Sequence, residues 1–199
     1  MAGRVGVLAL QGAFREHSAA LADVGLEPVE VRRADQLAGL AGLVIPGGES
    51  TTMSKLMVAY DLERPILELH AAGAPVFGTC AGMILVARHA VDGLPDQRFL
   101  GLIDIEVRRN AFGRQVASFE APIELAGDSQ PLTGVFIRAP WIESAGAQVE
   151  VLAVHDGHPI AAQQDNVLVC AFHPELTSDR RLHRRFAEMV ERSPRAVAA

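Results

Sequence analysis

Residues 75–91 read PVFGTCAGMILVARHAV and hold the strongest structural signal in the chain. The apolar stretch Pro75–Gly78 predicts a buried strand, and Gly82–Val91 predicts a helix directly after it. Glycines two positions either side of Cys80 form a glycine–X–nucleophile–X–glycine pattern, which permits a sharp turn without side-chain clashes. We expect this turn to place the Cys80 sulfur at the carboxyl edge of a sheet and the amino end of a helix, where the helix dipole and free N–H groups favour a thiolate. A buried cysteine in a glycine-rich turn is the alternative interpretation.

The same order of strand, turn and helix repeats along the first half of the chain. Apolar runs predict strands and 3.6-residue periodicity predicts helices, one of which ends near Val24. This order is typical of an α/β fold with a mostly parallel sheet and helices on both faces. The other predicted strands are Arg4–Leu10, Pro28–Val31 and Leu43–Ile45, and the other predicted helices are Thr51–Tyr60 and Pro65–Ala72.

The pattern of apolar and polar residues changes in the second half of the chain. Short alternating runs between Gly101 and about Glu150 predict an antiparallel elaboration on the sheet. A hairpin is expected around the turn Asp156-Gly157, and a final buried strand at Asn166–Phe172. Thr177 or Ser178 is expected to cap a last helix.

Composition sets limits on the class of protein. The chain has 199 residues, of which 49% are apolar and 21% charged, so we expect one folded domain over residues 1–192 and a frayed tail over residues 193–199. The net charge of −6, from 18 basic and 24 acidic residues, argues against nucleic-acid binding by bulk electrostatics. No apolar run approaches the roughly 18–20 residues of a membrane helix, and without a targeting segment the cytoplasm is the expected location. Two cysteines are too few for a disulfide scaffold or a thiolate zinc site, and no metal site is expected.

The tripeptide His173-Pro174-Glu175 follows the last predicted strand. Proline keeps His173 out of helical geometry, and residues two apart in an extended segment point to the same side. Glu175 could therefore hold one imidazole nitrogen while the other faces Cys80, as a Cys–His–Glu triad requires. A surface histidine beside an incidental glutamate is the alternative.

The remaining histidines and the second cysteine give weaker signals. His17 is ambiguous and could line a partner surface, whereas Cys170 lies within the final strand and is expected to be structural. The other expectations are helical positions for His70 and His89, a solvated loop for His155 and His158, and an arginine-rich surface for His183.

The segment PGGESTT, residues 46–52, is the third signal. Its two glycines let the backbone pass close to a ligand. It lacks the Gly-Lys-Ser/Thr ending of a P-loop, and no GxGxxG is present, so nucleotide binding is not supported. An oxyanion-hole loop or substrate cradle is expected, with Ser50 or Thr51 capping the following helix.

Together these segments resemble the class I, triad-type glutamine amidotransferases, and within them the glutaminase subunits of pyridoxal phosphate synthase. The matching motifs occur in family order and span most of the chain: LQGAFREH (10–17), PGGESTTM (46–53), FGTCAG (77–82), RNAFGRQ (109–115), SFEA (118–121), GVFIRAP (134–140) and FHPELT (172–177). Two positions depart from the pattern, namely Ala111, where serine is common, and Trp141, where histidine is often seen. The resemblance implies a three-layer, flavodoxin-like α/β fold.

The resemblance also implies roles for individual residues. Cys80 matches the nucleophile, and His173 and Glu175 complete the triad. Gly48, Glu49 and Ser50 match the glutamine-binding loop, and Arg109, Ile137 and Arg138 match its other glutamine contacts. Backbone N–H groups of Ala81 and of the Gly47–Gly48 loop are expected to form the oxyanion hole.

A synthase subunit is the partner that the resemblance implies. Glutamine would be hydrolysed to glutamate and ammonia, and the partner would use the ammonia, delivered through a protected route, with a pentose phosphate and a triose phosphate to make pyridoxal phosphate. Pyridoxal phosphate is then a product of the complex, and no bound cofactor is expected. Residues 11–17 are expected to form part of the interface.

Three other functions fit some of these signals. A glutaminase subunit of a different synthase would share the triad, although residues 109–115 and 134–140 argue against it. A cysteine hydrolase or redox sensor of related fold would keep a reactive Cys80 without a glutamine pocket. A non-catalytic binding module is disfavoured by the intact set of Cys80, His173 and Glu175.

Overall fold

The computed structural model describes residues 3–112 and 118–193. The strands of its largest sheet are β1 (Arg4–Leu8), β2 (Glu27–Val31), β3 (Gly42–Ile45), β4 (Val76–Thr79), β10 (Glu150–His155), β11 (His158–Gln164) and β12 (Val167–Cys170). Within the described residues this sheet has seven strands, in the order β10-β11-β12-β4-β3-β1-β2. The run from β12 to β2 is parallel, and β11 and β10 are added antiparallel. The predicted α/β class with a mostly parallel sheet is confirmed.

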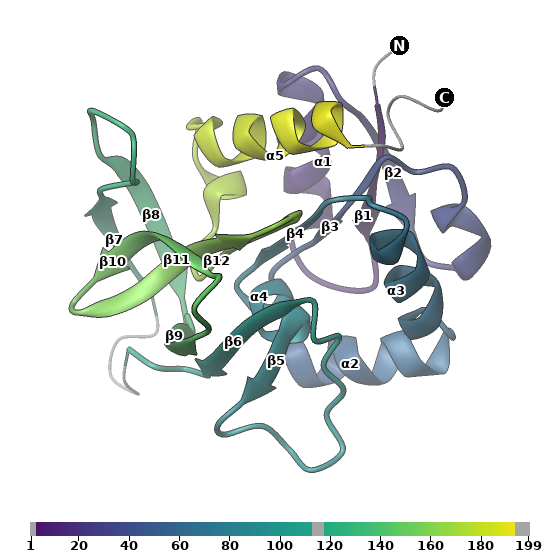
Figure 1. Ribbon diagram of the computed structural model, residues 1–199, viewed down its shortest axis with the longest axis horizontal. Helices are drawn as coiled ribbons and strands as arrows, with labels where there is room; N and C mark the ends of the chain where they lie inside the picture. Colours follow the sequence, from purple (N-terminus) through teal and green to yellow (C-terminus); the bar gives the residue numbers. More distant parts are fainter. Residues whose placement is uncertain (1–2, 113–117, 194–199) are drawn as a thin grey trace.

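Helices cover both faces of this sheet (Figure 1). Helices α1 (Phe14–Asp23) and α5 (Arg181–Arg192) lie on one face. Helices α2 (Ser50–Ala59), α3 (Glu63–Ala71) and α4 (Ala81–Val86) lie on the other. Strands β3, β4 and β12 are buried at every position because both of their faces pack against helices or other strands. Short 3-10 turns at η1 (Ala34–Leu37) and η2 (Pro174–Leu176) complete the connections.

Two smaller sheets carry most of the predicted elaboration. Strands β5 (Ala87–Ala90), β6 (Ile103–Arg108) and β9 (Trp141–Ala145) form one sheet, and β7 (Ser118–Ile123) pairs with β8 (Leu132–Ile137) in the other. Only the β10–β11 hairpin extends the main sheet, so the expected elaboration is largely separate from it. Its turn at Asp156-Gly157 has positive φ at both residues, as a tight hairpin requires.

The helix predicted over Gly82–Val91 is wrong in its second half. It ends at Val86, and Ala87 has the extended angles φ −62° and ψ 160°. The next segment takes the freed carbonyls, since Leu100 N–H donates to Leu85 O and Leu102 N–H donates to Val86 O. His89, expected on a helix, therefore lies on β5, which pairs with β6.

The start of α5 also differs from the prediction. Its N-cap is Arg180, whereas Thr177 follows the η2 turn and accepts a hydrogen bond from Asp179 N–H at its side-chain oxygen. Ser193, the first residue of the expected tail, is buried and donates from Oγ to Gly73 O. The rest of that tail lies outside the described residues, as do the last three residues of the 109–115 motif.

The histidines expected in a solvated loop lie on strands. His155 ends β10 and stacks on Phe119 and Phe136. His158 begins β11 and stacks on Trp141 with ring centroids 3.6 Å apart. Aromatic neighbours from β7, β8 and β9 thus cover both rings.

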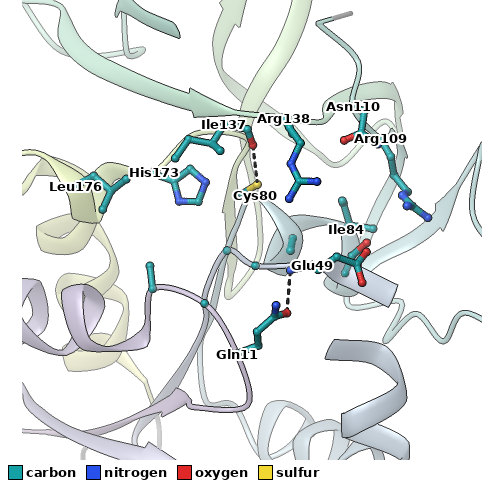
Figure 2. A pocket seen from close by; sticks show the side chains of 16 residues that line it. Gln11, Glu49, Cys80, Ile84, Arg109, Asn110, Ile137, Arg138, His173 and Leu176 are labelled. Carbon is teal, nitrogen blue, oxygen red and sulfur yellow. Dashed lines mark hydrogen bonds between the residues drawn. The ribbon is translucent and has the colours of Figure 1, made fainter. Parts of the chain in front are cut away.

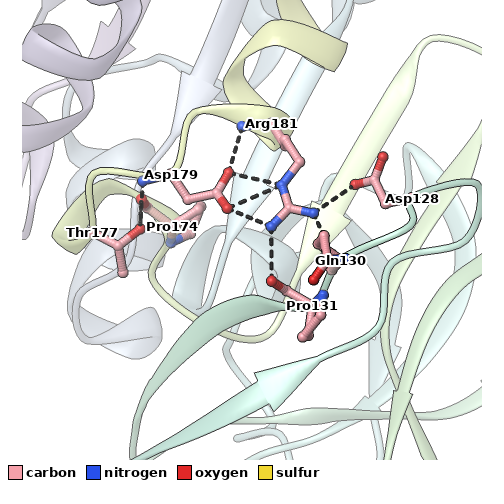
Figure 3. A network of polar contacts seen from close by, with 7 residues as sticks. All are labelled: Asp128, Gln130, Pro131, Pro174, Thr177, Asp179 and Arg181. Carbon is pink, nitrogen blue, oxygen red and sulfur yellow. Dashed lines mark hydrogen bonds and ion pairs between the residues drawn. The ribbon is translucent and has the colours of Figure 1, made fainter.

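Arg181 ties the beginning of α5 to the loop before β8 (Figure 3). Its guanidinium donates to both carboxylate oxygens of Asp179 and to Asp128 Oδ2 at 3.2 Å. It also donates to Gln130 O at 2.6 Å and Pro131 O at 3.1 Å. The planar guanidinium of Arg181 therefore joins two segments that are far apart in the sequence.

Replacing Arg181 by methionine should lower the free energy of unfolding by about 1–3 kcal/mol, because the stem is kept while two carbonyls and two carboxylates lose their donor. Arg192→Met on the same helix is the matched control. Within residues 3–112 and 118–193 the polar contacts of the Arg192 side chain are to Glu188, and the side chain is 72% exposed, so its loss should cost no more than about 0.5 kcal/mol. Urea unfolding midpoints measure the difference, and equal midpoints for the two variants would contradict the assigned role of Arg181.

Candidate active site

The strand order places the loops that carry the predicted site residues at one edge of the sheet. Strands β12, β4, β3 and β1 are parallel neighbours, so their carboxyl ends lie side by side. His173 follows β12, Cys80 follows β4, residues 47–50 follow β3 and residues 11–13 follow β1. Ligands bind at this edge in open α/β sheets, where strand order reverses.

These loops enclose a pocket of about 350 Å³ (Figure 2). Arg109 and Asn110 after β6, and Ile137 and Arg138 at the end of β8, close its other side. Every residue predicted for the site lines this pocket except Glu175, which lies behind His173. The lining residues are Gln11, Gly12, Ala13, Gly47, Gly48, Glu49, Ser50, Cys80, Ala81, Ile84, Arg109, Asn110, Ile137, Arg138, His173 and Leu176.

Cys80 occupies a strained turn between β4 and α4. Its φ of 49° and ψ of −105° are rare for a residue with a side chain. A side chain at Gly82 would collide with Ile45 O, and one at Gly78 would press on the Gly82 carbonyl. The flanking glycines thus let the turn pack against β3, and the sulfur reaches the pocket although Cys80 is only 6% exposed.

His173 is held between Cys80 and Glu175. Its Nδ1 lies 2.7 Å from Glu175 Oε1, and its ring faces the pocket. Burial lowers the pKa of His173, but hydrogen bonds to Cys80 and Glu175 outweigh burial and raise the pKa to about 10. Both partners therefore favour the protonated imidazole.

Glu175 lies in the interior with its carboxylate fully buried. Burial raises its pKa, but His17 and His173 outweigh burial, so the pKa lies below its ordinary value. His17 is itself fully buried, with Nε2 3.3 Å from Glu175 Oε2. The expectation that His17 lines a partner surface is therefore wrong, because α1 turns this side chain toward the sheet.

His183 and Cys170 are also buried. His183, expected on an arginine-rich surface, has no exposed area and contacts His17 instead. Cys170 is fully buried, and burial raises its thiol pKa well above the ordinary value, as suits the structural role expected for it.

The glycines of the β3 loop permit two close approaches. A side chain at Gly47 would collide with the His173 ring and approach Cys80 Cβ to 3.3 Å. A side chain at Gly12 would collide with the Gly47 carbonyl, which accepts a hydrogen bond from Ala13 N–H. Gln11 Oε1 also accepts from Glu49 N–H at 3.0 Å. The turn after β1 thus holds this loop against the nucleophile.

Glu49, rather than Ser50 or Thr51, caps α2. Its carboxylate accepts from the backbone N–H groups of Thr51 and Thr52 and from both of their hydroxyls. Burial raises the pKa of Glu49, but these hydrogen bonds outweigh it and lower the pKa to about 2. The pocket therefore contains a fixed negative charge.

Two arginines face the negative group from the other side of the pocket. Arg138 has a φ of 45° and extends from β8 toward Cys80 (Figure 2). Arg109 lies farther from Cys80, where its guanidinium donates to Gln97 Oε1 and its backbone N–H donates to Asp92. Arg138 is the better placed of the two for a substrate near the sulfur.

Residues 7–192 match the family model described as the SNO glutamine amidotransferase family. The chain belongs to the SNO glutamine amidotransferase family. The match includes the loops after β1, β3, β4 and β12, and the buried residues His17, Glu175 and His183.

Curated relatives in the SNO family are similar over nearly their whole length. "Pyridoxal 5'-phosphate synthase subunit PdxT" from Acidothermus cellulolyticus is 60% identical, over 94% of this chain and 93% of the relative. The protein of the same name from Frankia alni is 56% identical, over 96% of each chain. A solved structure titled "Crystal structure of glutamine amidotransferase" is 50% identical, with a TM-score of 0.88 over 94% of this chain and 98% of the other. The solved structure of PurLQS from Thermotoga maritima, 16% identical with a TM-score of 0.66 over 96% of each chain, shares the fold.

Sequence reasoning missed several residues of this SNO-family site. Gln11 stands out in the sequence only as part of the motif 10–17, yet it anchors the β3 loop. His17 and His183 gave no usable signal, since their burial depends on how α1 and α5 pack. No helix among the described residues has the length and apolar character to cross a membrane, and no His, Cys, Asp and Glu cluster in that part could hold a metal ion.

Proposed function

We propose that this chain is the glutaminase subunit of a pyridoxal 5'-phosphate synthase. It hydrolyses L-glutamine to L-glutamate and ammonia and delivers the ammonia to a synthase subunit. The observation that carries the proposal is the alignment of Cys80, His173 and Glu175 at one pocket, in a chain 54–60% identical to eight proteins named as PdxT subunits. The predicted cytoplasmic location belongs to the same proposal.

The charges of the pocket suit glutamine as a zwitterion. Glu49 is ionised and can face an α-ammonium group, while Arg138 can face an α-carboxylate. Gly48 and Ser50 beside Glu49, together with Arg109 and Ile137, complete the proposed binding residues. The side-chain amide would then reach toward Cys80, which lines the same pocket.

Catalysis follows from the groups around the sulfur. The protonated imidazole of His173 stabilises a thiolate by charge, and the sulfur attacks the amide carbon of glutamine. Backbone N–H groups of Ala81 and of the Gly47–Gly48 loop hold the oxyanion, where each donor is worth about 2.7–4 kcal/mol. The Ala81 N–H is available because amides of a first helical turn have no intrahelical partner.

His173 then acts twice as a proton carrier. It gives its proton to the departing ammonia, and the neutral ring accepts a proton from the water that attacks the thioester. Glu175 orients the ring and stabilises its charged form through the contact with Nδ1. Glutamate leaves, and the sulfur and the imidazole return to their starting state.

Glutamate release from glutamine, by the chain alone and with its cognate synthase subunit, tests the proposal. Release should be weak alone and strong with the partner. A glutamine-analogue electrophile should label Cys80, and glutamine should protect it whereas asparagine should not. No release under either condition from folded protein would reject the glutaminase, and labelling without glutamine protection would favour a cysteine hydrolase.

A further inference from the structure

Two buried histidines lie directly behind the Cys80, His173 and Glu175 set, and the proposed mechanism leaves them unused. His17 comes from α1 and His183 from α5, and neither has exposed area. His17 Nε2 lies 3.0 Å from Thr79 Oγ1 and 3.3 Å from Glu175 Oε2, and His17 Nδ1 lies 3.1 Å from His183 Nε2. A continuous line of polar contacts therefore runs from α5 through α1 to the residue that orients His173.

The count of hydrogen-bond donors and acceptors selects one arrangement of protons along these contacts. Among the described residues, Glu175 Oε2 accepts no well-formed hydrogen bond and His183 Nδ1 has no partner. If His17 carries its proton on Nε2, the N–H is shared between Thr79 Oγ1 at 3.0 Å and Glu175 Oε2 at 3.3 Å, and Nδ1 can accept from His183 Nε2–H. The opposite tautomer would aim a lone pair at the carboxylate and leave an orphan N–H on His183, which costs more than an orphan lone pair.

We propose, on the basis of the proposed glutaminase activity, that His17 is a positioning residue which fixes the carboxylate plane of Glu175. Held at Oε1 alone, a glutamate carboxylate turns readily, because its terminal torsion has a broad, two-fold energy profile. The contact of His17 with Oε2 holds the second oxygen, so that Oε1 keeps its hydrogen bond with His173 Nδ1. His183 in turn fixes the tautomer of His17.

Both histidines act in the neutral form. Burial lowers the pKa of His17 and lowers that of His183 to about 2. The N–H dipole of a neutral His17 stabilises the carboxylate without adding a second buried cation beside His173. The titratable or charged groups that bear on this pair are Glu16 on α1, Arg180 before α5, and His173 and Glu175 themselves.

A pair of polar substitutions tests the contact. Glutamine at position 17 carries its amide nitrogen as many bonds from Cα as His17 Nε2, so it can reach Glu175, whereas asparagine reaches only the Nδ1 side. We expect kcat of glutamate release, in the complex with the synthase subunit, to fall about tenfold to a hundredfold in His17→Asn, the range for losing an outer partner of a site residue. KM should stay within about twofold, since substrate contacts are untouched, and His17→Gln should recover most of kcat.

The pH profile separates positioning from damage to the fold. Loss of His17 removes the N–H that stabilises the ionised carboxylate of Glu175, so the pKa of Glu175 should rise. Activity should then fail at higher pH on the acid side in His17→Asn and return toward the original profile in His17→Gln. Leu21→Ala is the structural control, because Leu21 is fully buried on the same helix. Its profile should keep its shape even if the folded fraction falls.

Alkylation of Cys80 by iodoacetamide gives a readout that does not require glutaminase activity. Its rate against pH reports the coupled Cys80 and His173 pair, with Cys80→Ala as the blank. The midpoint should rise by about half a pH unit or more in His17→Asn, because a less firmly held Glu175 supports the imidazolium less. An unchanged midpoint, or equal kcat in the Asn and Gln variants, would overturn the inference. If the unmodified complex releases no glutamate, the proposed function fails, and the midpoint alone still decides whether His17 positions Glu175.

Discussion

Replacing Cys80 by alanine is expected to abolish glutamate release while the chain stays folded. Without the sulfur no thioester forms, and the loss should reach about 10⁶-fold in kcat, as for removal of other catalytic nucleophiles. The side chain adds little to the core, because it lines the pocket and lies outside the main hydrophobic cluster. Glutamate release with the synthase subunit measures the activity, and circular dichroism measures the fold. Substantial hydrolysis by a clean, folded variant would reject Cys80 as the nucleophile.

The same position allows a test of backbone strain. Glycine normally destabilises a protein relative to alanine, because it loses more conformational freedom on folding. At φ 49° and ψ −105° the order should reverse, because only glycine adopts these angles without steric cost. Both Cys80 variants should be inactive, and Cys80→Gly should exceed Cys80→Ala in stability by about 1 kcal/mol. Thermal melting compares them, and a lower midpoint for the glycine variant would show that the turn is not strained.

The parts of the site that sequence could predict are those governed by local rules. The glycines around Cys80 and the glycine pair after β3 each constrain their own backbone. The extended segment expected at His173-Pro174-Glu175 is wrong, because Pro174–Leu176 form a 3-10 turn, although Glu175 still reaches His173. Parallel strands then bring the three loops to one edge, whatever the details of packing. This is why the pocket in the structure contains the predicted residues from segments far apart in the chain.

Features that depend on distant partners could not be predicted in this way. The helix after Cys80 ends at Val86 because residues 100–102 compete for its last carbonyls, and nothing within residues 82–91 signals those partners. Polar side chains at His17 and His183 suggest a surface until α1 and α5 pack over the sheet and bury them. The missed strand β9 pairs with β6, from which it is separated by more than thirty residues. A short strand in a small sheet gains most of its stability from such pairing.

Gly47→Ala is the second substitution for which a large effect is expected. The added methyl group would collide with the His173 ring and crowd Cys80, neither of which can retreat, because Glu175 fixes the ring and the strained turn fixes the cysteine. The β3 loop must therefore move, which withdraws its oxyanion donor. We expect kcat to fall by about 10²- to 10³-fold or more, the usual effect of losing one such donor. Moving the loop should also lower the free energy of unfolding by about 1–3 kcal/mol, the usual cost of overpacking, although Gly47 is not among the residues with positive φ.

Gly39→Ala supplies the matched control. Gly39 precedes β3, at the opposite end of that strand from the pocket, has a φ of 72°, and has no atom within 4 Å of an added Cβ. This variant should lose about 1 kcal/mol of stability through backbone strain and keep its activity. The two variants thus separate backbone strain from steric contact at the site, since both are expected to lose stability and only Gly47→Ala is expected to lose activity. If Gly47→Ala retains full glutamate release, the loop does not hold the oxyanion in the arrangement seen here, and the donor from this side of the pocket must come from another backbone group.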